Sequence, residues 1–512
     1  MVLTFVLEDP ETTDHGRSSS SPEAPLGRTV TGEARQRSAR RIKCDEARPE
    51  CRRCTVSRIV CRGYTVPDPA APIGTRRDAG VEQKRDIRPR VVPPEIEPMD
   101  WEFQETIRYF FQVVEPDLSP EARRLGPDDL KDKNFPRHIL YANVISDQLE
   151  RASKARGRVL RPGDDPAFAA SWAGYHRSVV DNIRTVNQLL RDDARYAGEA
   201  APATLAILQL LISDLKAALF LWTAHLRGFL AYVEHRGGAS AIMALPKPEK
   251  SRLSPILAFT MQINTHCPAD QQIKGTDDFT DEEIRTLIDF DPSKVEPCPV
   301  EFHLARVRIT RLRVALAGPR SPPEHAVVDA KVKAILDMLW NADLDGWVRD
   351  QYGDKSEALQ DKARSLAPIY AVAIRLYGIL TLPPSAVSAW AGSTAEARRR
   401  YPAVPGGGGG GGGVYEGLRR GHRDELLQML REGWATITRK MWLAWPLTVV
   451  GVAVADDHAA NRVFVDRCLL AIWRMPDVSN SSITALEKLR VFWLSGKTGW
   501  EDCFDEPIPS AV

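Results

Sequence analysis

The chain has 512 residues, of which 43% are hydrophobic and 27% charged, and 69 Lys and Arg against 68 Asp and Glu give a formal net charge of +1. This apolar content is enough for a large core and excludes a wholly disordered protein. The length predicts about three domain-equivalents, or one large domain with small appendages.

Residues 1–39 are rich in Ser, Pro and Arg and show little periodic pattern. They have no basic region of the kind that begins a secretory signal, and the chain turns acidic at Glu8 and Asp9. The longest mostly apolar stretch, from Leu205 to Val233, is interrupted by charged side chains. We therefore expect no transmembrane helix, no membrane partner, and an intracellular protein with mostly reduced cysteines.

A dense basic segment extends from Arg35 to Arg62, where ten Lys and Arg residues oppose three acids. It contains four of the eight cysteines, with the spacing C-x6-C-x2-C-x6-C: Cys44, Cys51, Cys54 and Cys61. In a reducing compartment such clustering favours a metal site, and zinc prefers four tetrahedral ligands such as thiolates. The charge alone fits either polyanion binding or a solvated basic arm, and the cysteines favour the first.

The stretch RRIKCDEARPECRRCTVSRIVCRGY resembles the binuclear zinc cluster DNA-binding domain of fungal transcription factors. The basic run before Cys44, the Cys44-Asp45 step, the loop proline Pro49 and the last three cysteines all match the family pattern. The resemblance implies a nuclear transcription regulator that binds double-stranded DNA and reads CGG-type half-sites. It also leaves room for a homodimer and for transcriptional co-regulators as partners.

The resemblance also assigns roles to single residues. Arg41 matches the principal base-contacting position, and Arg40 and Lys43 match flanking base or phosphate contacts, because Lys and Arg suit guanine in the major groove. The basic residues of the second half are expected at phosphates: Arg52, Arg53 and Arg58. The zinc ligands are expected to be Cys44, Cys51, Cys54 and Cys61.

The segment departs from the family at its first two cysteines, whose positions are held by Ala34 and Arg37. Six thiolates hold two zinc ions in the family, so the four present here predict one ion or none. Two explanations stay open: true degeneration of the cluster, or an incorrectly assigned start of the coding sequence. A degenerate cluster would leave a helical regulatory protein that no longer binds DNA and acts through protein or small-molecule contacts.

Residues 65–98 are rich in proline and charge, which predicts an extended linker after the DNA-binding segment at 40–64. Residues 99–512 show helical periodicity and resemble the helical regulatory domain of the same transcription factors. The fold class is therefore mostly α. Helices are predicted around 137–156, 166–191, 202–237, 281–290, 300–316, 326–340, 354–380, 415–445, 457–474 and 482–494, with an earlier one near Phe103–Phe111.

Eight glycines at 406–413 predict a flexible loop within this domain, either a hinge or a tolerated repeat expansion. On the helix before Gly237, the buried face is expected to contain Leu226, Phe229, Leu230 and Val233. Trp442 and Trp445 are expected in the core, with Pro446 starting or kinking a helix.

Catalytic motifs are lacking in the sequence, apart from trivial matches in the glycine tract, so we expect no enzyme. His225 and His235 are too far apart along one helix to share a metal ion, so we expect them to be polar-face or packing residues. His266 and Cys267 have no second ligand pair nearby. The remaining cysteines are expected to be core or surface thiols: Cys267, Cys298, Cys468 and Cys503.

Overall fold

The structure is a computed structural model that describes 108–109, 137–192, 201–217, 222–244, 256–273, 279–290, 298–318, 324–404, 412–476 and 478–509. All of these residues lie in one unit, which includes Pro98–Val512. They are mostly helical and contain no strand, which confirms the mostly α fold class.

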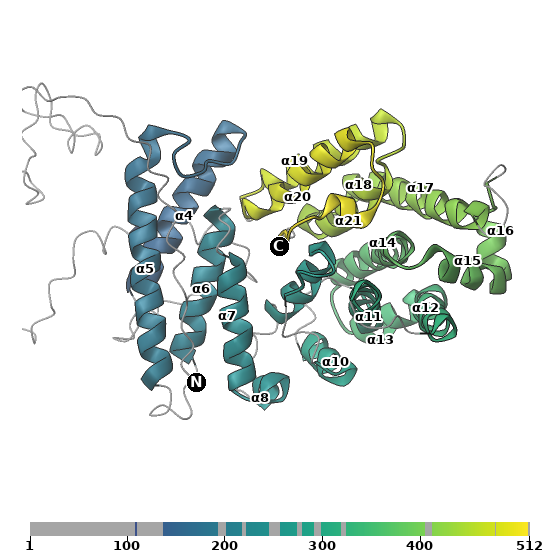
Figure 1. The fold of residues 1–512 in the computed structure, drawn as a ribbon, viewed down its shortest axis with the longest axis horizontal. Helices are drawn as coiled ribbons and strands as arrows, with labels where there is room; N and C mark the ends of the chain where they lie inside the picture. Colours follow the sequence, from purple (N-terminus) through teal and green to yellow (C-terminus); the bar gives the residue numbers. More distant parts are fainter. Residues whose placement is uncertain are drawn as a thin grey trace, which may run out of the picture. The chain divides into compact units, whose positions relative to one another are not determined.

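The N-terminal half of this domain packs around its own hydrophobic core. Helix α4 packs against both α5 and α6, and α6 packs in turn against α7 (Figure 1). The elements of this half are α4 (Arg137–Arg156), η3 (Pro166–Phe168), α5 (Ala169–Asp192), α6 (Ala201–Ala217), α7 (Trp222–His235), α8 (Gly238–Ala244), η4 (Asn264–His266) and α10 (Asp281–Phe290).

The C-terminal half has a second core, centred on the long helix α14 (Figure 1). Its elements are α11 (Val300–Ala317), α12 (His325–Trp340), α13 (Leu344–Tyr352), α14 (Glu357–Thr381), α15 (Pro384–Ser393), α16 (Ala395–Arg400), α17 (Gly412–Thr436), η6 (Lys440–Leu443), α18 (Ala444–Ala453), α19 (Ala459–Trp473), α20 (Ser481–Ser495) and α21 (Trp500–Cys503). α14 is long and apolar enough to cross a membrane, but 78% of its most apolar window is buried inside this domain.

Helix α11 belongs to both cores. Leu304 and Val307 pack into the first core, whereas Phe302, Ala305 and Ile309 pack into the second. A separate connection comes from Lys154 on α4, whose Nζ donates to the carbonyls of Met475 at 2.7 Å and Val478 at 2.6 Å. The two halves are therefore joined by one shared helix and by polar contacts.

Most of the predicted helices are confirmed, two of them with the predicted bounds, at Arg137–Arg156 and Asp281–Phe290. α10 begins with a capping box, in which Thr280 N donates to Glu283 Oε2 at 2.8 Å and Glu283 N donates to Thr280 Oγ1 at 3.2 Å. The predicted apolar face of α7 is buried as expected, and Gly237 and Gly238 end this helix with φ of 105° and 75°.

Two long helices predicted from periodicity are wrong. The predicted helix at 202–237 is two helices, of which α6 ends at Ala217 and α7 begins at Trp222. The predicted helix at 415–445 ends at Thr436, where Lys440 Nζ caps the carbonyls of Trp434 and Ile437. The earlier helix predicted near Phe103–Phe111 lies outside the described residues, except for positions 108 and 109.

Candidate functional site

Every residue predicted to bind zinc or DNA lies outside the described residues: Arg40, Arg41, Lys43, Cys44, Cys51, Arg52, Arg53, Cys54, Arg58 and Cys61. The number of cysteines in this segment sets how many zinc ions it can hold. Four thiolates would complete one tetrahedral zinc site and fall short of two.

A polar seam joins the two cores around the short helix η4. Thr265 lies at its centre, fully buried, between two tryptophans of the second core. Trp445 Nε1 donates to Thr265 Oγ1 at 3.0 Å, and Trp500 Nε1 donates to the Thr265 carbonyl at 2.8 Å. Because each indole has a single N–H donor, these bonds hold both rings in fixed orientations against η4. Trp445 is buried as expected, whereas Trp442 is only half-buried and lies against Lys362.

Arg313 of α11 completes this seam. Its guanidinium donates to the carbonyls of Asn264 at 3.3 Å and Thr265 at 3.1 Å, and its Nε lies 3.2 Å from Glu501. The side chain is 4% exposed, so these carbonyls have little access to water as an alternative donor. Arg313 therefore fastens η4 of the first half to α21 of the second.

His266 is enclosed by the same seam. Its ring stacks 6.0 Å from Trp500 and lies 4.9 Å from Phe504, measured between ring centroids. Burial, and then the positive charges of Arg313 and Arg306, lower the pKa of His266 to about 3. The ring is thus a neutral packing group, and no metal site forms between His266 and Cys267 within the described part of the chain.

A second buried polar group lies inside the first core. His225 Nε2 is 3.0 Å from Asp214 Oδ2, and Tyr175 donates its hydroxyl to Asp214 Oδ1. The sequence suggested a packing or polar-face role for His225, and it is in fact a buried partner of a carboxylate, whereas His235 is exposed. Because Asp214 lies on α6 and His225 on α7, with a break between the two helices, sequence spacing alone did not predict that they pair.

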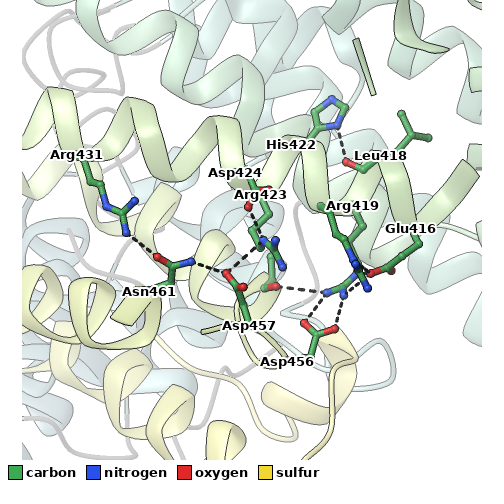
Figure 2. Close-up of polar contacts among 12 residues, drawn as sticks. Glu416, Leu418, Arg419, His422, Arg423, Asp424, Arg431, Asp456, Asp457 and Asn461 are labelled. Atoms are coloured by element: carbon green, nitrogen blue, oxygen red, sulfur yellow. Dashed lines mark hydrogen bonds and ion pairs between the residues drawn. The ribbon is translucent and has the colours of Figure 1, made fainter. Parts of the chain in front are cut away.

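A network of charged and polar contacts ties α17 to the turn between α18 and α19 (Figure 2). Arg419 lies between Glu416 and Asp456, with its Nε 2.9 Å from Glu416 Oε2. The neighbouring carboxylate Asp457 accepts from Asn461, and Asn461 accepts in turn from Arg431 at 2.6 Å (Figure 2). Every acid in this chain of contacts has a cationic or amide partner, so the network is a structural clamp.

The described residues contain no group of three or more His, Cys, Asp or Glu side chains arranged to hold a metal ion. The four described cysteines are buried thiols outside any disulfide.

Comparison with known proteins places the chain. Residues 38–71 match the family model of the fungal Zn(2)-Cys(6) binuclear cluster domain. The chain is also 24% identical over 510 aligned positions to the phomenoic acid biosynthesis cluster-specific transcriptional regulator of Leptosphaeria maculans, covering 91% of this chain and 87% of that protein. Together these findings support a DNA-binding transcription regulator.

No solved structure matches this chain. Its family match begins at position 38, just after Arg37, and holds four cysteines. The similarity to the Leptosphaeria regulator extends far beyond the cluster, into the helical domain described above. Both comparisons point to a DNA-binding regulator.

Proposed function

We propose that this regulator binds CGG-type half-sites in the nucleus through residues 40–64 and regulates transcription through the helical domain at 99–512. The observation that carries the proposal is the family match over 38–71, which coincides with the densest basic segment of the chain. Zinc-dependent DNA binding then requires no catalytic group elsewhere, and we assign the protein no enzymatic activity.

The residue roles follow the family pattern. Arg41 reads guanine, Arg40 and Lys43 contact bases or phosphates beside it, and the second-half arginines bind phosphates: Arg52, Arg53 and Arg58. Cys44, Cys51, Cys54 and Cys61 hold a single zinc ion. Since small zinc modules fold only with their metal, that ion determines whether the basic side chains are presented to DNA at all.

The gene targets are proposed from the relative. Because the similar Leptosphaeria protein is named as specific to one biosynthesis cluster, we propose that this chain also controls the genes of a biosynthetic cluster. A second copy of the chain and transcriptional co-regulators complete the proposed partners.

The test uses the full-length protein. Zinc per chain is measured by plasma mass spectrometry, and affinity by fluorescence anisotropy on a duplex with paired CGG triplets and on a scrambled duplex. We expect one zinc per chain and preference for CGG. Arg41→Ala should remove about 1–3 kcal/mol of that preference, whereas Arg52→Ala should weaken both duplexes alike. Arg398→Ala, at an exposed position of α16, is the matched control.

A second candidate is a regulator that no longer binds DNA. It is favoured by one observation, the four cysteines in a segment whose family is named for six. Absence of zinc together with equal, weak binding to both duplexes would establish it and overturn the first proposal. The 5′ end of the transcript separates the two causes, because a C-x2-C pair six residues before Cys44 would restore the full cluster.

A further inference from the structure

Cys298 differs chemically from the other described cysteines. Its Sγ lies 3.3 Å from Nε2 of His303, on the first turn of α11. Burial instead raises the pKa of Cys267 and of Cys468 to about 12, and raises that of Cys503 further. Those three thiols stay protonated near neutral pH and react poorly.

Arg306 determines which ring nitrogen of His303 carries the proton. Its Nη2 lies 3.3 Å from His303 Nδ1, one turn along the same helix. A guanidinium can only donate, so Nδ1 must accept, and the proton of the neutral ring lies on Nε2. Nε2–H therefore donates to the sulfur of Cys298, and a thiolate is the form of sulfur that accepts this bond best.

The arrangement is rigidly supported. Arg306 and His303 are each 2% exposed, and Arg306 Nη1 donates to Gln262 Oε1 at 3.3 Å while its guanidinium lies 5.2 Å from the Trp445 ring centre. The positive charge of Arg306 stabilises the negative charge of a thiolate at Cys298, because a buried site with a low dielectric constant screens the attraction between the two charges poorly. From α13, burial and then the charge of Cys298 raise the pKa of Tyr352, which keeps that hydroxyl neutral beside the sulfur.

We propose that Cys298 is a covalent modification site for small soft electrophiles such as α,β-unsaturated carbonyl compounds, with His303 and Arg306 as its positioning residues. The thiol first releases its proton to solvent. The sulfur lone pair then forms a C–S bond at the β-carbon, and a solvent proton adds at the α-carbon. With iodoacetamide as the probe, the C–S bond forms as the C–I bond breaks and iodide leaves.

Modification of Cys298 is expected to disturb the packing at the centre of the domain. Cys298 is 7% exposed, so an adduct must displace part of its surroundings. The displaced groups belong to the start of α11, the helix that packs into both cores and continues to the seam. Alkylated protein should therefore melt at a lower temperature than unmodified protein.

The experiment treats full-length protein with iodoacetamide at pH 7 and follows each cysteine peptide by mass spectrometry. We expect Cys298 to react about tenfold faster than Cys267, Cys468 or Cys503, or more. His303→Leu should reduce the rate of Cys298 relative to Cys468 by about tenfold, and His303→Gln, which keeps an N–H donor, should restore most of it.

The ratio of rates within one sample separates activation from unfolding, because a destabilised variant exposes all four thiols together. Equal rates for the four cysteines in the unmutated protein would overturn the proposal. So would an unchanged ratio in His303→Leu.

Discussion

Glycines at the contact between α16 and α17 show how single residues set this fold. A Cβ at Gly421 would overlap the ring of Tyr401, and that ring lies 4.1 Å from His422 between centroids and donates its hydroxyl to Glu425. The Tyr401 ring therefore has no direction in which to retreat. By contrast, a Cβ at Gly392 in α15 would meet nothing within 4 Å.

These two glycines predict opposite responses to the same substitution. Gly421→Ala should destabilise the protein by about 1–3 kcal/mol, because it overpacks a closed site. Gly392→Ala should be neutral or stabilise it by up to about 1 kcal/mol, through helix propensity. Urea denaturation of both variants measures the difference, and equal effects would contradict the packing argument.

The neutral ring of His266 makes stability depend on pH. Its pKa is about 3 in the folded protein and about 6.5 in an unfolded chain. The unfolded state binds the extra proton between these values, so stability falls as the pH drops below about 6.5, and the loss stops growing near pH 3. At pH 5 this amounts to roughly 2 kcal/mol relative to pH 7.5.

The measurement is the free energy of unfolding in urea at both pH values. His266→Gln should lose less stability between pH 7.5 and pH 5 than the unmutated protein, by that amount. His235→Gln, at an exposed position of α7, is the control and should keep the original pH dependence. Parallel losses in all three proteins would exclude His266 as the cause.

At the scale of elements, the chain on either side of the glycine tract is closed by a hydrogen bond. Val404 N donates to the Gly413 carbonyl at 3.0 Å, and Gly413 already belongs to α17. The connection at 405–411 lies outside the described residues, but its two ends meet. A tolerated expansion fits this closure better than a hinge between moving parts.

Deleting Gly407–Gly410 tests this interpretation. The deletion shortens the connection from eight residues, 405–412, to four. Halving a flexible loop is expected to stabilise the folded state by only about 0.6 kcal/mol. Thermal unfolding should thus change little, whereas a large loss of stability or of DNA affinity would favour a hinge.

Periodicity predicted most helices because their buried faces recur every three or four residues, as Leu226, Phe229, Leu230 and Val233 do. It failed at Thr436, where the helix is followed by a side-chain cap from Lys440, because a cap of this kind leaves no trace in the spacing of apolar residues. α13 was missed because its short apolar pattern is weak, although Asp343 accepts from Gly346 N at 2.8 Å as an N-cap.

The sites followed the same rule. The proposed zinc and DNA contacts are local in sequence, so spacing and the family pattern could suggest them, and they stay predictions because they lie outside the described residues. The seam could not be predicted, because Trp500 and Thr265 are 235 positions apart and only the folded chain brings them together. The contact between His303 and Cys298 was likewise not predicted from the sequence.

At the scale of the whole domain, the seam couples two cores that each resemble a small domain. Arg313→Met would remove one donor from each of the carbonyls of Asn264 and Thr265, which keep Gln272 Nε2 and Trp500 Nε1 as donors. It would also remove the partner of Glu501, which is half-exposed and can be solvated by water. We expect a loss of about 1–3 kcal/mol and separation of one unfolding transition into two.

Calorimetry with near-UV circular dichroism checks this expectation. Arg308→Met is the control, because Arg308 lies on the same helix but pairs with Asp281 near the surface, where an ion pair contributes about 1 kcal/mol or less. A single cooperative transition in Arg313→Met would show that α11 and the remaining contacts between the halves couple the cores without Arg313.

Because Val404 and Gly413 are hydrogen-bonded to each other, the glycine tract between them is a suitable site for inserting another folded domain. A folded tag whose N- and C-termini lie close together, such as a fluorescent protein, could be inserted there without separating α16 from α17. Both chain ends would stay native, including the basic segment that matches the zinc-cluster family. The regulator could then be followed in living cells while its DNA-binding end remains unaltered.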